Sequence, residues 1–291
     1  MNQTETQSVT PTRIGPATFA WGTRTFVMGI VNVTPDSFSG DGLLDPGASR
    51  LSGSRAAPAA NAVALARTMA EEGADVLDVG GESTRPGHIA VDAADEILRV
   101  VAVVAAIRGA LPSMPISIDT TKPAVAAAAI DAGADLVNDV WGVGEDDALV
   151  RLAAERRVPI VLMHNRAESR YRDLMAEVAD DLERAIERAL RVGVAWTDIL
   201  VDPGFGFGKT AEHNLVLLRE LGSLRRLGRP ILLGASRKST LGKVLDLPAN
   251  ERLEATIATT VIGIAGGADI VRVHDVQPNV RAARMTDAVL R

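Results

Sequence analysis

Gly73-Ala74-Asp75, Gly133-Ala134-Asp135 and Gly267-Ala268-Asp269 are three copies of one joint, and each is followed by a short apolar run. Glycine suits the left-handed backbone position just after a helix. The runs that follow are rich in Val, Ile and Leu, as buried strands are. The joint therefore predicts a helix-to-strand connection that recurs along the chain.

Eight apolar strands alternate with amphipathic helices in this reading, which is typical of a parallel sheet covered by helices. The expected strands are 25–31, 75–79, 116–119, 135–138, 159–163, 198–202, 230–234 and 269–273. The expected helices are 59–72, 92–109, 122–132, 146–156, 174–192, 213–221, 252–265 and 278–290. Eight strands favour closure into a (β/α)8 TIM barrel. A doubly wound open sheet is the structural alternative.

The 291 residues are expected to form one domain over 13–291 behind a flexible N-terminus at 1–12. A short hairpin within 14–21 is expected to plug the barrel floor. The formal net charge of −6 provides no basic field for nucleic acid. The absence of cysteine excludes disulfides and thiolate sites. No apolar run is long enough to span a membrane, so we expect no membrane partner. The absence of cysteine favours a cytoplasmic protein, and we expect no nucleic-acid partner.

Two long loops follow the first and second strands, at 32–58 and 80–88. The segment 39–58 is rich in Gly, Ser and Pro and lacks the periodicity of a helix or strand. A long loop of this kind in a compact domain is usually functional or disordered. We expect both loops to be mobile without ligand and to close over a bound substrate.

Polar side chains stand at the ends of the predicted strands: Asp78, Asp119, Asn138, Asp202, Arg272 and His274. In a barrel these ends meet at one face, where active sites lie. A single aspartate there is explained equally well as a helix cap. Three such groups from three strands, namely Asp119, Asn138 and Asp202, are better explained by a ligand with adjacent N–H donors and a carbonyl, such as an aminopyrimidinone ring. Arg272 and His274 face the same way on one strand and suit a diphosphate.

The segment Gly204-Phe205-Gly206-Phe207-Gly208-Lys209 alternates glycines with aromatic residues. Aromatic side chains in a flexible loop favour a stacking role, and the alternative is that one of them folds back into the core. Ser236-Arg237-Lys238-Ser239 follows the seventh strand and suits an anion or an electron-rich ring, with a solvated charge pair as the alternative. The four histidines show no metal-ligand spacing, so no structural zinc site is expected.

Seven motifs, in order along the chain, resemble those of the dihydropteroate synthases, the folate-pathway enzymes blocked by sulfonamides. They are Asn32-Val-Thr-Pro-Asp-Ser-Phe38, Asp78-Val-Gly-Gly-Glu-Ser-Thr-Arg-Pro-Gly87, Asp119-Thr120, Asn138-Asp139, Asp202-Pro-Gly-Phe-Gly-Phe-Gly-Lys209, Ser236-Arg-Lys-Ser239 and Arg272-Val-His274. The resemblance runs from Phe26 to the C-terminus. It departs at Gly40, which intervenes before Asp41 where the family reads Phe-x-Asp. Sulfonamide resistance is a hypothesis attached to this altered loop.

The resemblance implies a transferase that joins p-aminobenzoate to 6-hydroxymethyl-7,8-dihydropterin diphosphate, giving 7,8-dihydropteroate and diphosphate. It also implies Mg2+ and a homodimer. For the pterin it implies Asp119, Asn138, Met163, Asp202 and Lys238, with Asp78 supporting them from behind. For the diphosphate it implies Asn32 through Mg2+, with Thr84, Arg85, Arg272 and His274. For p-aminobenzoate it implies Phe38, Thr84, Arg85, Pro86, Phe205, Lys238 and Ser239. The catalytic set is Asp119, Asp202, Lys238, Arg272 and His274.

Two other functions remain open from the sequence. One is a pterin-binding methyl-transfer module that passes a methyl group to a corrinoid partner, and the other is a non-catalytic homologue. The Ser-Arg-Lys-Ser and Arg-x-His motifs argue for the synthase over the first. The complete loop motifs argue against the second. Release of diphosphate separates all three.

Overall fold

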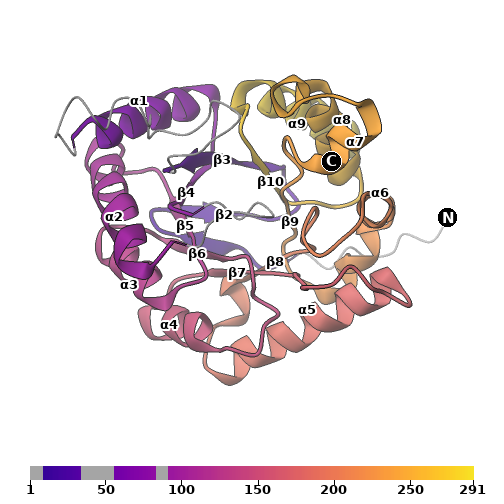
Figure 1. The fold of residues 1–291 in the computed structure, drawn as a ribbon, viewed down its shortest axis with the longest axis horizontal. Helices are drawn as coiled ribbons and strands as arrows, with labels where there is room; N and C mark the ends of the chain where they lie inside the picture. Colours follow the sequence, from indigo (N-terminus) through magenta and orange to yellow (C-terminus); the bar gives the residue numbers. More distant parts are fainter. Residues whose placement is uncertain (1–8, 34–55, 83–90) are drawn as a thin grey trace.

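The computed structural model describes residues 9–33, 56–82 and 91–291, and every structural statement refers to these residues. Parallel strands form the centre of the molecule and helices surround them (Figure 1). The barrel strands are β3 (Phe26–Asn32), β4 (Val76–Gly80), β5 (Ile116–Asp119), β6 (Leu136–Asp139), β7 (Ile160–Met163), β8 (Ile199–Asp202), β9 (Leu232–Leu233) and β10 (Ile270–Val273). Their order in the sheet is β8-β7-β6-β5-β4-β3-β10-β9.

The sheet closes between β8 and the residues that lead into β9. Val201 and Ile231 form a parallel bridge, and the Val201 N–H donates to the Pro230 carbonyl oxygen at 3.0 Å. This contact joins the two outer strands of the order given above. The predicted (β/α)8 barrel is therefore confirmed, and the open doubly wound sheet is excluded.

Helices form the outer layer of the barrel. They are α1 (Ala56–Glu72), α2 (Ala93–Ala110), α3 (Pro123–Asp131), α4 (Ala148–Arg156), α5 (Leu174–Arg191), α6 (Ala211–Arg219), α7 (Ser239–Leu245), α8 (Leu253–Ala265) and α9 (Val276–Leu290), with 3-10 turns η2 (Trp196–Asp198), η3 (Leu221–Leu227) and η4 (Ala249–Glu251). Helix α7 was not predicted, because seven residues give too little periodicity to recognise. Within the described ranges, no helix is long and apolar enough to cross a membrane.

The three Gly-Ala-Asp joints take the predicted form. Gly73, Gly133 and Gly267 have φ angles of 101°, 115° and 98°, in the left-handed region that ends a helix. The aspartate of each joint then accepts a backbone N–H from the start of the neighbouring strand. Asp75 accepts from Val27 at 2.8 Å, Asp135 from Ile116 at 2.9 Å and Asp269 from Ile231 at 3.0 Å.

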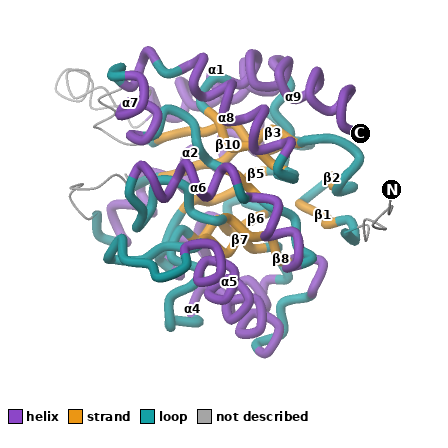
Figure 2. The backbone as a smooth tube through the Cα atoms, turned by 90° about the vertical axis from the view of Figure 1, so that its right-hand side faces the viewer, coloured by secondary structure: helices purple, strands orange, loops and turns teal. Residues whose placement is uncertain are grey.

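A hairpin of β1 (Thr12–Ile14) and β2 (Ala17–Phe19) covers one end of the barrel, as predicted (Figure 2). Its residues join one buried cluster with inward-facing side chains of the strands: Ile14, Phe19, Trp21, Phe26, Met28, Val76, Leu136, Val161, Leu200, Leu232 and Ile270. We call this cluster the barrel floor. Thr12 belongs to β1 and its hydroxyl donates to the Thr197 carbonyl at 2.5 Å, whereas the domain boundary expected after residue 12 stays a prediction.

Inward side chains change character within two residues along β4, β6, β8 and β10. Outward residues such as Val137 pack under the helices in a separate, larger cluster. On these four strands the inward residue of the barrel floor is apolar, and the next inward position in the chain direction is polar. The pairs are Val76 and Asp78, Leu136 and Asn138, Leu200 and Asp202, and Ile270 and Arg272. This alternation places the polar set together at the carboxyl ends of the strands.

Candidate active site

The polar strand-end residues converge at the end of the barrel opposite the floor, which we call the mouth. Pairing between strands sets them side by side: Gly80 with Asp119, Asp119 with Asn138, and Met163 with Asp202. By the alternation along their strands, Asn32, Arg272 and His274 face the same interior. The side chains of Asn138 and Asp202 are almost fully buried, 3% and 5% exposed. The structure thus brings together the strand-end residues that the sequence singled out.

Arg272 lies between two carboxylates at the centre of the mouth. Its Nε donates to Asp78 Oδ2 at 2.5 Å and its Nη2 donates to Asp119 Oδ2 at 2.7 Å. The Asn138 amide also donates to Asp78 Oδ2, at 3.2 Å. The sequence analysis expects Arg272 at the diphosphate and in the catalytic set. Its position also links it to the carboxylate predicted to hold the pterin, because an arginine fork can serve two oxygens at once.

Two carboxylate oxygens in this centre have no protein partner within the described part of the chain. They are Asp78 Oδ1 and Asp119 Oδ1, and both are buried. A buried polar atom without a hydrogen bond is costly, so such an atom in a native protein calls for an explanation. N–H donors of a ligand in the mouth would supply these bonds.

Burial shifts the pKa values of three charged residues in the mouth. It raises the pKa of Asp119 to about 7, against the opposing charge of Arg272 and with the help of Asp78. It also raises the pKa of Asp202, against Lys238. Burial lowers the pKa of Lys238 to about 8, against Asp202. The mouth therefore holds two buried acids and one buried base, and a bound ligand would alter the protonation of each.

The loop after β8 packs closely against two neighbours through its glycines. Gly204, Gly206 and Gly208 have φ angles of 70°, 84° and 52°. A Cβ atom on Gly204 would lie 1.8 Å from the His164 carbonyl oxygen, and one on Gly206 would lie 2.7 Å from Lys238 Cδ. Only glycine fits such positions.

The two phenylalanines of this loop differ in burial, and the buried one is the one predicted to contact p-aminobenzoate. Phe205 is fully buried in the core under the helices, so its ring offers no stacking face to p-aminobenzoate. Phe207 is partly exposed, with its ring centroid 4.2 Å from Lys238 Nζ. Phe205 contributes its carbonyl oxygen instead, which accepts a hydrogen bond from Lys238 Nζ. Alternating residues on an irregular loop do not share a face, which is why the sequence could not distinguish the two.

Ser236 was not predicted as a site residue, and it holds His274. Its hydroxyl lies 3.0 Å from His274 Nδ1 and accepts the His274 backbone N–H at 3.2 Å. Lys238 precedes helix α7, and Ser239 is its exposed first residue. The sequence signal for Ser236 was only its place in the Ser-Arg-Lys-Ser motif.

Several predicted residues lie outside the described ranges: Phe38, Gly40, Thr84, Arg85 and Pro86. Their roles, the mobility and closure of the two loops and the hypothesis of sulfonamide resistance therefore stay predictions. Asn32 is described, at the end of β3 and partly buried. Across residues 9–33, 56–82 and 91–291, no group of three or more His, Cys, Asp or Glu side chains could hold a metal ion.

Comparison with known proteins agrees with this geometry. The family model of pterin binding enzymes matches residues 28–274. A dihydropteroate synthase of Clostridium beijerinckii is 48% identical over 280 residues, covering 96% of this chain and 99% of the relative. Among solved structures, a Clostridium difficile dihydropteroate synthase in the presence of pteroic acid superposes with a TM-score of 0.86 at 47% identity, covering 94% of this chain and 99% of the other. A Xanthomonas albilineans dihydropteroate synthase with 4-aminobenzoic acid gives a TM-score of 0.87 at 38% identity, covering 97% and 98%.

Proposed function

The chain belongs to the pterin-binding enzymes and, within them, to the dihydropteroate synthases, and we propose how its own residues carry out the reaction of that family. The reaction joins p-aminobenzoate to 6-hydroxymethyl-7,8-dihydropterin diphosphate in folate biosynthesis. The observation that best supports this assignment is the buried pair Asp78 and Asp119, each with an unpartnered oxygen at the mouth of the described barrel.

In this proposal, polar side chains of the mouth hold the pterin ring. Asp119, Asn138 and Asp202 face its N–H donors and carbonyl, Met163 packs beside it, and Lys238 covers its other side. Asp78 orients Asn138 and Arg272, and its second carboxylate oxygen is a further acceptor for the ring. The related Clostridium difficile enzyme was solved in the presence of pteroic acid, and we extend that ligand class to this chain.

The transfer step needs charge stabilisation more than a protein nucleophile. The amino nitrogen of p-aminobenzoate bonds to the pterin methylene carbon as the bond from that carbon to the diphosphate oxygen breaks, and the nitrogen then loses one proton. Arg272 on β10 and His274 directly after this strand are proposed to neutralise the departing diphosphate. Asp119 and Asp202 stabilise the positive charge that develops on the pterin. Positioning supplies much of the remaining acceleration.

The p-aminobenzoate pocket is proposed to use Lys238, Ser239 and Phe207, together with the predicted residues Phe38, Thr84, Arg85 and Pro86. Phe207 takes the place first given to Phe205, because its ring lies beside Lys238. The related Xanthomonas albilineans enzyme was solved with 4-aminobenzoic acid. The amine of this substrate is already a neutral nucleophile, so the pocket has to orient it and exclude water.

Mg2+ is proposed to bind at Asn32 together with the substrate diphosphate. One amide oxygen facing the mouth fits a cation that prefers oxygen ligands and is commonly held by a few protein groups plus phosphates. The ion would supply positive charge to the leaving group. Turnover that survives complete chelation by EDTA would remove Mg2+ from the proposal. The variant Asn32→Ala is expected to raise the Mg2+ concentration needed for half-maximal turnover.

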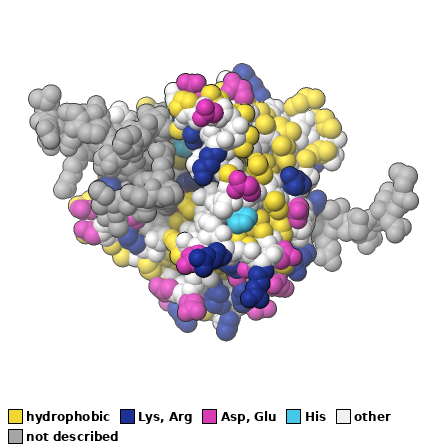
Figure 3. All heavy atoms as spheres, turned by 45° about the vertical axis from the view of Figure 1, so that its right-hand side comes forward, with side chains coloured by type: hydrophobic (Ala, Val, Ile, Leu, Met, Phe, Trp, Pro, Cys, Tyr) yellow, Lys and Arg dark blue, Asp and Glu magenta, His cyan; other side chains and the backbone are white. Residues whose placement is uncertain are grey.

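A homodimer is proposed through the exposed apolar face of α8 and α9. Ala258, Val261, Ile262 and Ala265 form an exposed stripe with helical spacing on α8. Met285 and Val289 add 67% and 70% exposed side chains on the neighbouring helix α9. Figure 3 shows hydrophobic side chains gathered on this part of the surface. The stripe suits a second copy of the chain, since one face that pairs with itself around a two-fold axis is the commonest way to form a dimer.

Sedimentation of Ile262→Glu tests the dimer against a matched control. Leu98→Glu introduces the same charge at an exposed leucine of α2. Ile262→Glu is expected to sediment as a monomer, and Leu98→Glu as the dimer. A parent chain that sediments as a monomer at micromolar concentration would refute the interface.

The reaction itself is tested by release of diphosphate from the pterin substrate in the presence and absence of p-aminobenzoate. We expect stoichiometric release of diphosphate and formation of dihydropteroate only when both substrates are present. Methyl transfer to a corrinoid without diphosphate release would favour the methyl-transfer alternative. Tight pterin binding without any turnover would favour the non-catalytic alternative.

A further inference from the structure

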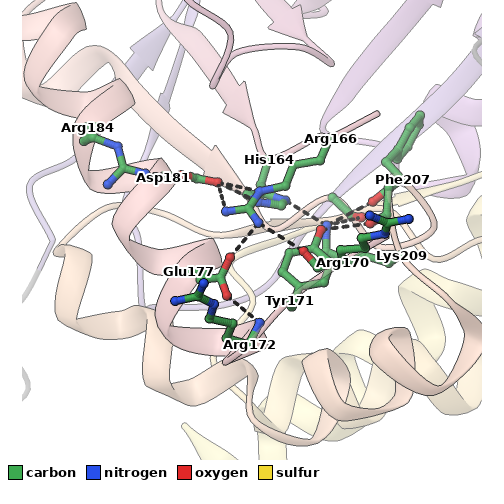
Figure 4. Close-up of polar contacts among 12 residues, drawn as sticks. His164, Arg166, Arg170, Tyr171, Arg172, Glu177, Asp181, Arg184, Phe207 and Lys209 are labelled. Carbon is green, nitrogen blue, oxygen red and sulfur yellow. Dashed lines mark hydrogen bonds and ion pairs between the residues drawn. The ribbon is translucent and has the colours of Figure 1, made fainter. Parts of the chain in front are cut away.

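Lys209 binds the backbone of the glycine-phenylalanine loop, residues 204–208, through its side chain. Its Nζ donates to the carbonyl oxygens of Gly204 and Phe207, each at 3.1 Å, and lies 2.9 Å from His164 Nδ1 (Figure 4). All three protons of the ammonium group are therefore used. Burial lowers the pKa of Lys209 to about 7, against the attraction of Asp202, yet three acceptors around one nitrogen require the protonated form for all the bonds to exist together.

His164 anchors this lysine to the body of the barrel. Its side chain is fully buried, and its Nε2 lies 3.2 Å from Asp181 Oδ2 on helix α5. Arg166 donates to the same Asp181 oxygen at 2.7 Å, which fixes the carboxylate. Burial lowers the pKa of His164 to about 3, so the ring is neutral near pH 7. It then donates from Nε2 to Asp181 and accepts from Lys209 at Nδ1.

The loop that Lys209 fixes is the one that holds Lys238. The Phe205 carbonyl, between the two carbonyls bound by Lys209, accepts from Lys238 Nζ. The Phe207 ring lies 4.2 Å from the same nitrogen. The close approach of Gly206 to the Lys238 stem adds a third contact. Any shift of the Gly204–Phe207 turn would therefore move the ammonium group of Lys238.

We propose that Lys209, held by His164, is a positioning residue for the transfer reaction, and that it acts by fixing the loop that orients Lys238 toward the pterin and p-aminobenzoate. This role rests on the proposed function of Lys238. Lys209 itself is not proposed to touch either substrate, because its three donors are used by the protein. A misplacement of about 1 Å in a positioned group is enough to cost roughly a hundredfold in rate.

The test is a double-mutant cycle with Lys209→Met and Lys238→Met. The readouts are kcat/KM for p-aminobenzoate and the calorimetric affinity for pteroic acid, which remains measurable if turnover is lost. Lys209→Met keeps the aliphatic stem and removes the donors. We expect it to lower kcat/KM by about tenfold to hundredfold and to weaken pteroic acid binding. In the Lys238→Met background the same substitution is expected to have at most about a twofold effect, because the group it positions is absent.

Lys243→Met is the matched control, since Lys243 is an exposed lysine on the neighbouring helix α7. It is expected to leave both readouts unchanged in either background. If the effects of Lys209→Met and Lys238→Met simply multiply, Lys209 does not act through Lys238 and the proposal is wrong. Unchanged kcat/KM in Lys209→Met with a normal melting temperature would overturn it as well.

Failure of the function proposed for Lys238 gives a different result. Lys238→Met would then keep the activity of the parent and its affinity for pteroic acid, whatever the effect of Lys209→Met. If Lys209→Met does not fold, Lys209→Gln retains an amide donor for the two carbonyls and enters the same cycle. His164→Asn, which keeps an acceptor for Lys209, is expected to lose less activity than Lys209→Met. A greater loss of kcat/KM in His164→Asn than in Lys209→Met would contradict the proposal that His164 acts through Lys209.

Discussion

The two ends of the barrel use the same strands and the same residue types for opposite purposes. At the floor, the joint aspartates Asp75, Asp135 and Asp269 accept backbone N–H groups of neighbouring strands. At the mouth, Asp78 and Asp119 are buried, and each keeps one oxygen without a partner in the described part of the chain. Satisfied carboxylates stabilise the fold, whereas unsatisfied ones are available to a ligand.

The two ends are separated by only two positions along a strand. Leu200 belongs to the apolar floor and Asp202 to the polar mouth, and both point inward. This spacing lets the floor contribute rigidity to the mouth without contacting the substrate. The comparison predicts that floor substitutions lower stability and leave kcat/KM unchanged. Mouth substitutions are expected to lower kcat/KM with little change in stability, unless they leave a buried charge unpaired.

Arg272→Ala is expected to have the largest effect, because it is the mouth residue that also neutralises two buried carboxylates. Removing one partner of a buried ion pair costs roughly 3–5 kcal/mol. Activity is expected to fall with it, by at least about tenfold, since charge-assisted hydrogen bonds to the diphosphate are lost as well. Urea unfolding and steady-state kinetics measure the two effects. Stability equal to that of the parent would show that Asp78 and Asp119 do not depend on Arg272.

Leu200→Ala tests the floor. Its side chain is fully buried in the floor cluster, and such truncations cost about 2–5 kcal/mol. We expect kcat/KM per folded molecule to stay within about threefold of the parent value, because the cavity lies away from the substrate. A drop in kcat/KM comparable to that of a mouth variant would break the division between the two ends.

Asp119→Asn sharpens the comparison through pH. The pKa of Asp119 is raised to about 7 in the folded chain, mainly by burial, so its contribution to stability is present below its ordinary pKa and is lost as the pH rises through 7. The variant has no such titration. Relative to the parent, its free energy of unfolding is expected to increase between pH 5 and pH 8 by at least about 1 kcal/mol. A difference that stays constant over this range would contradict the raised pKa.

Arg24→Ala is expected to have the smallest effect. Arg24 pairs with Asp75 at the floor end at 2.6 Å, but its side chain is 51% exposed. Exposed ion pairs contribute about 0–1 kcal/mol, and Asp75 keeps its bond to the Val27 N–H. Chemical denaturation should therefore resolve little change, and turnover should be unaffected. A loss above about 2 kcal/mol would mean that the floor relies on charge as much as the mouth does.

The sequence predicted the barrel and its polar strand ends because both follow from simple periodicity. A strand that alternates direction places Leu136 and Asn138 on one face whatever the rest of the fold does. The floor hairpin was visible as a short apolar segment before the first strand. These features depend on local order along the chain.

Other features depended on distances between segments far apart in the sequence. The pairing of Arg272 with Asp78 and Asp119 spans 194 and 153 residues, and no local pattern distinguishes it from a diphosphate clamp. The burial of Phe205 rather than Phe207 depends on how an irregular loop packs. Helix α7 was too short to predict. The link from His164 to Lys209 was missed because a lone histidine is more often structural.

The most direct test compares Asp119→Asn at the mouth end of β5 with Asp135→Asn at the floor end of the barrel, directly before the neighbouring strand β6, two isosteric changes. For each, kcat/KM for the pterin diphosphate and the free energy of unfolding are measured at pH 7. Asp119→Asn is expected to lose about tenfold to hundredfold in kcat/KM with the smaller change in stability. Asp135→Asn is expected to lose about 1–3 kcal/mol of stability with its bond to Arg108 and to keep its kcat/KM. Full activity in Asp119→Asn would contradict the assignment of the mouth as the pterin site.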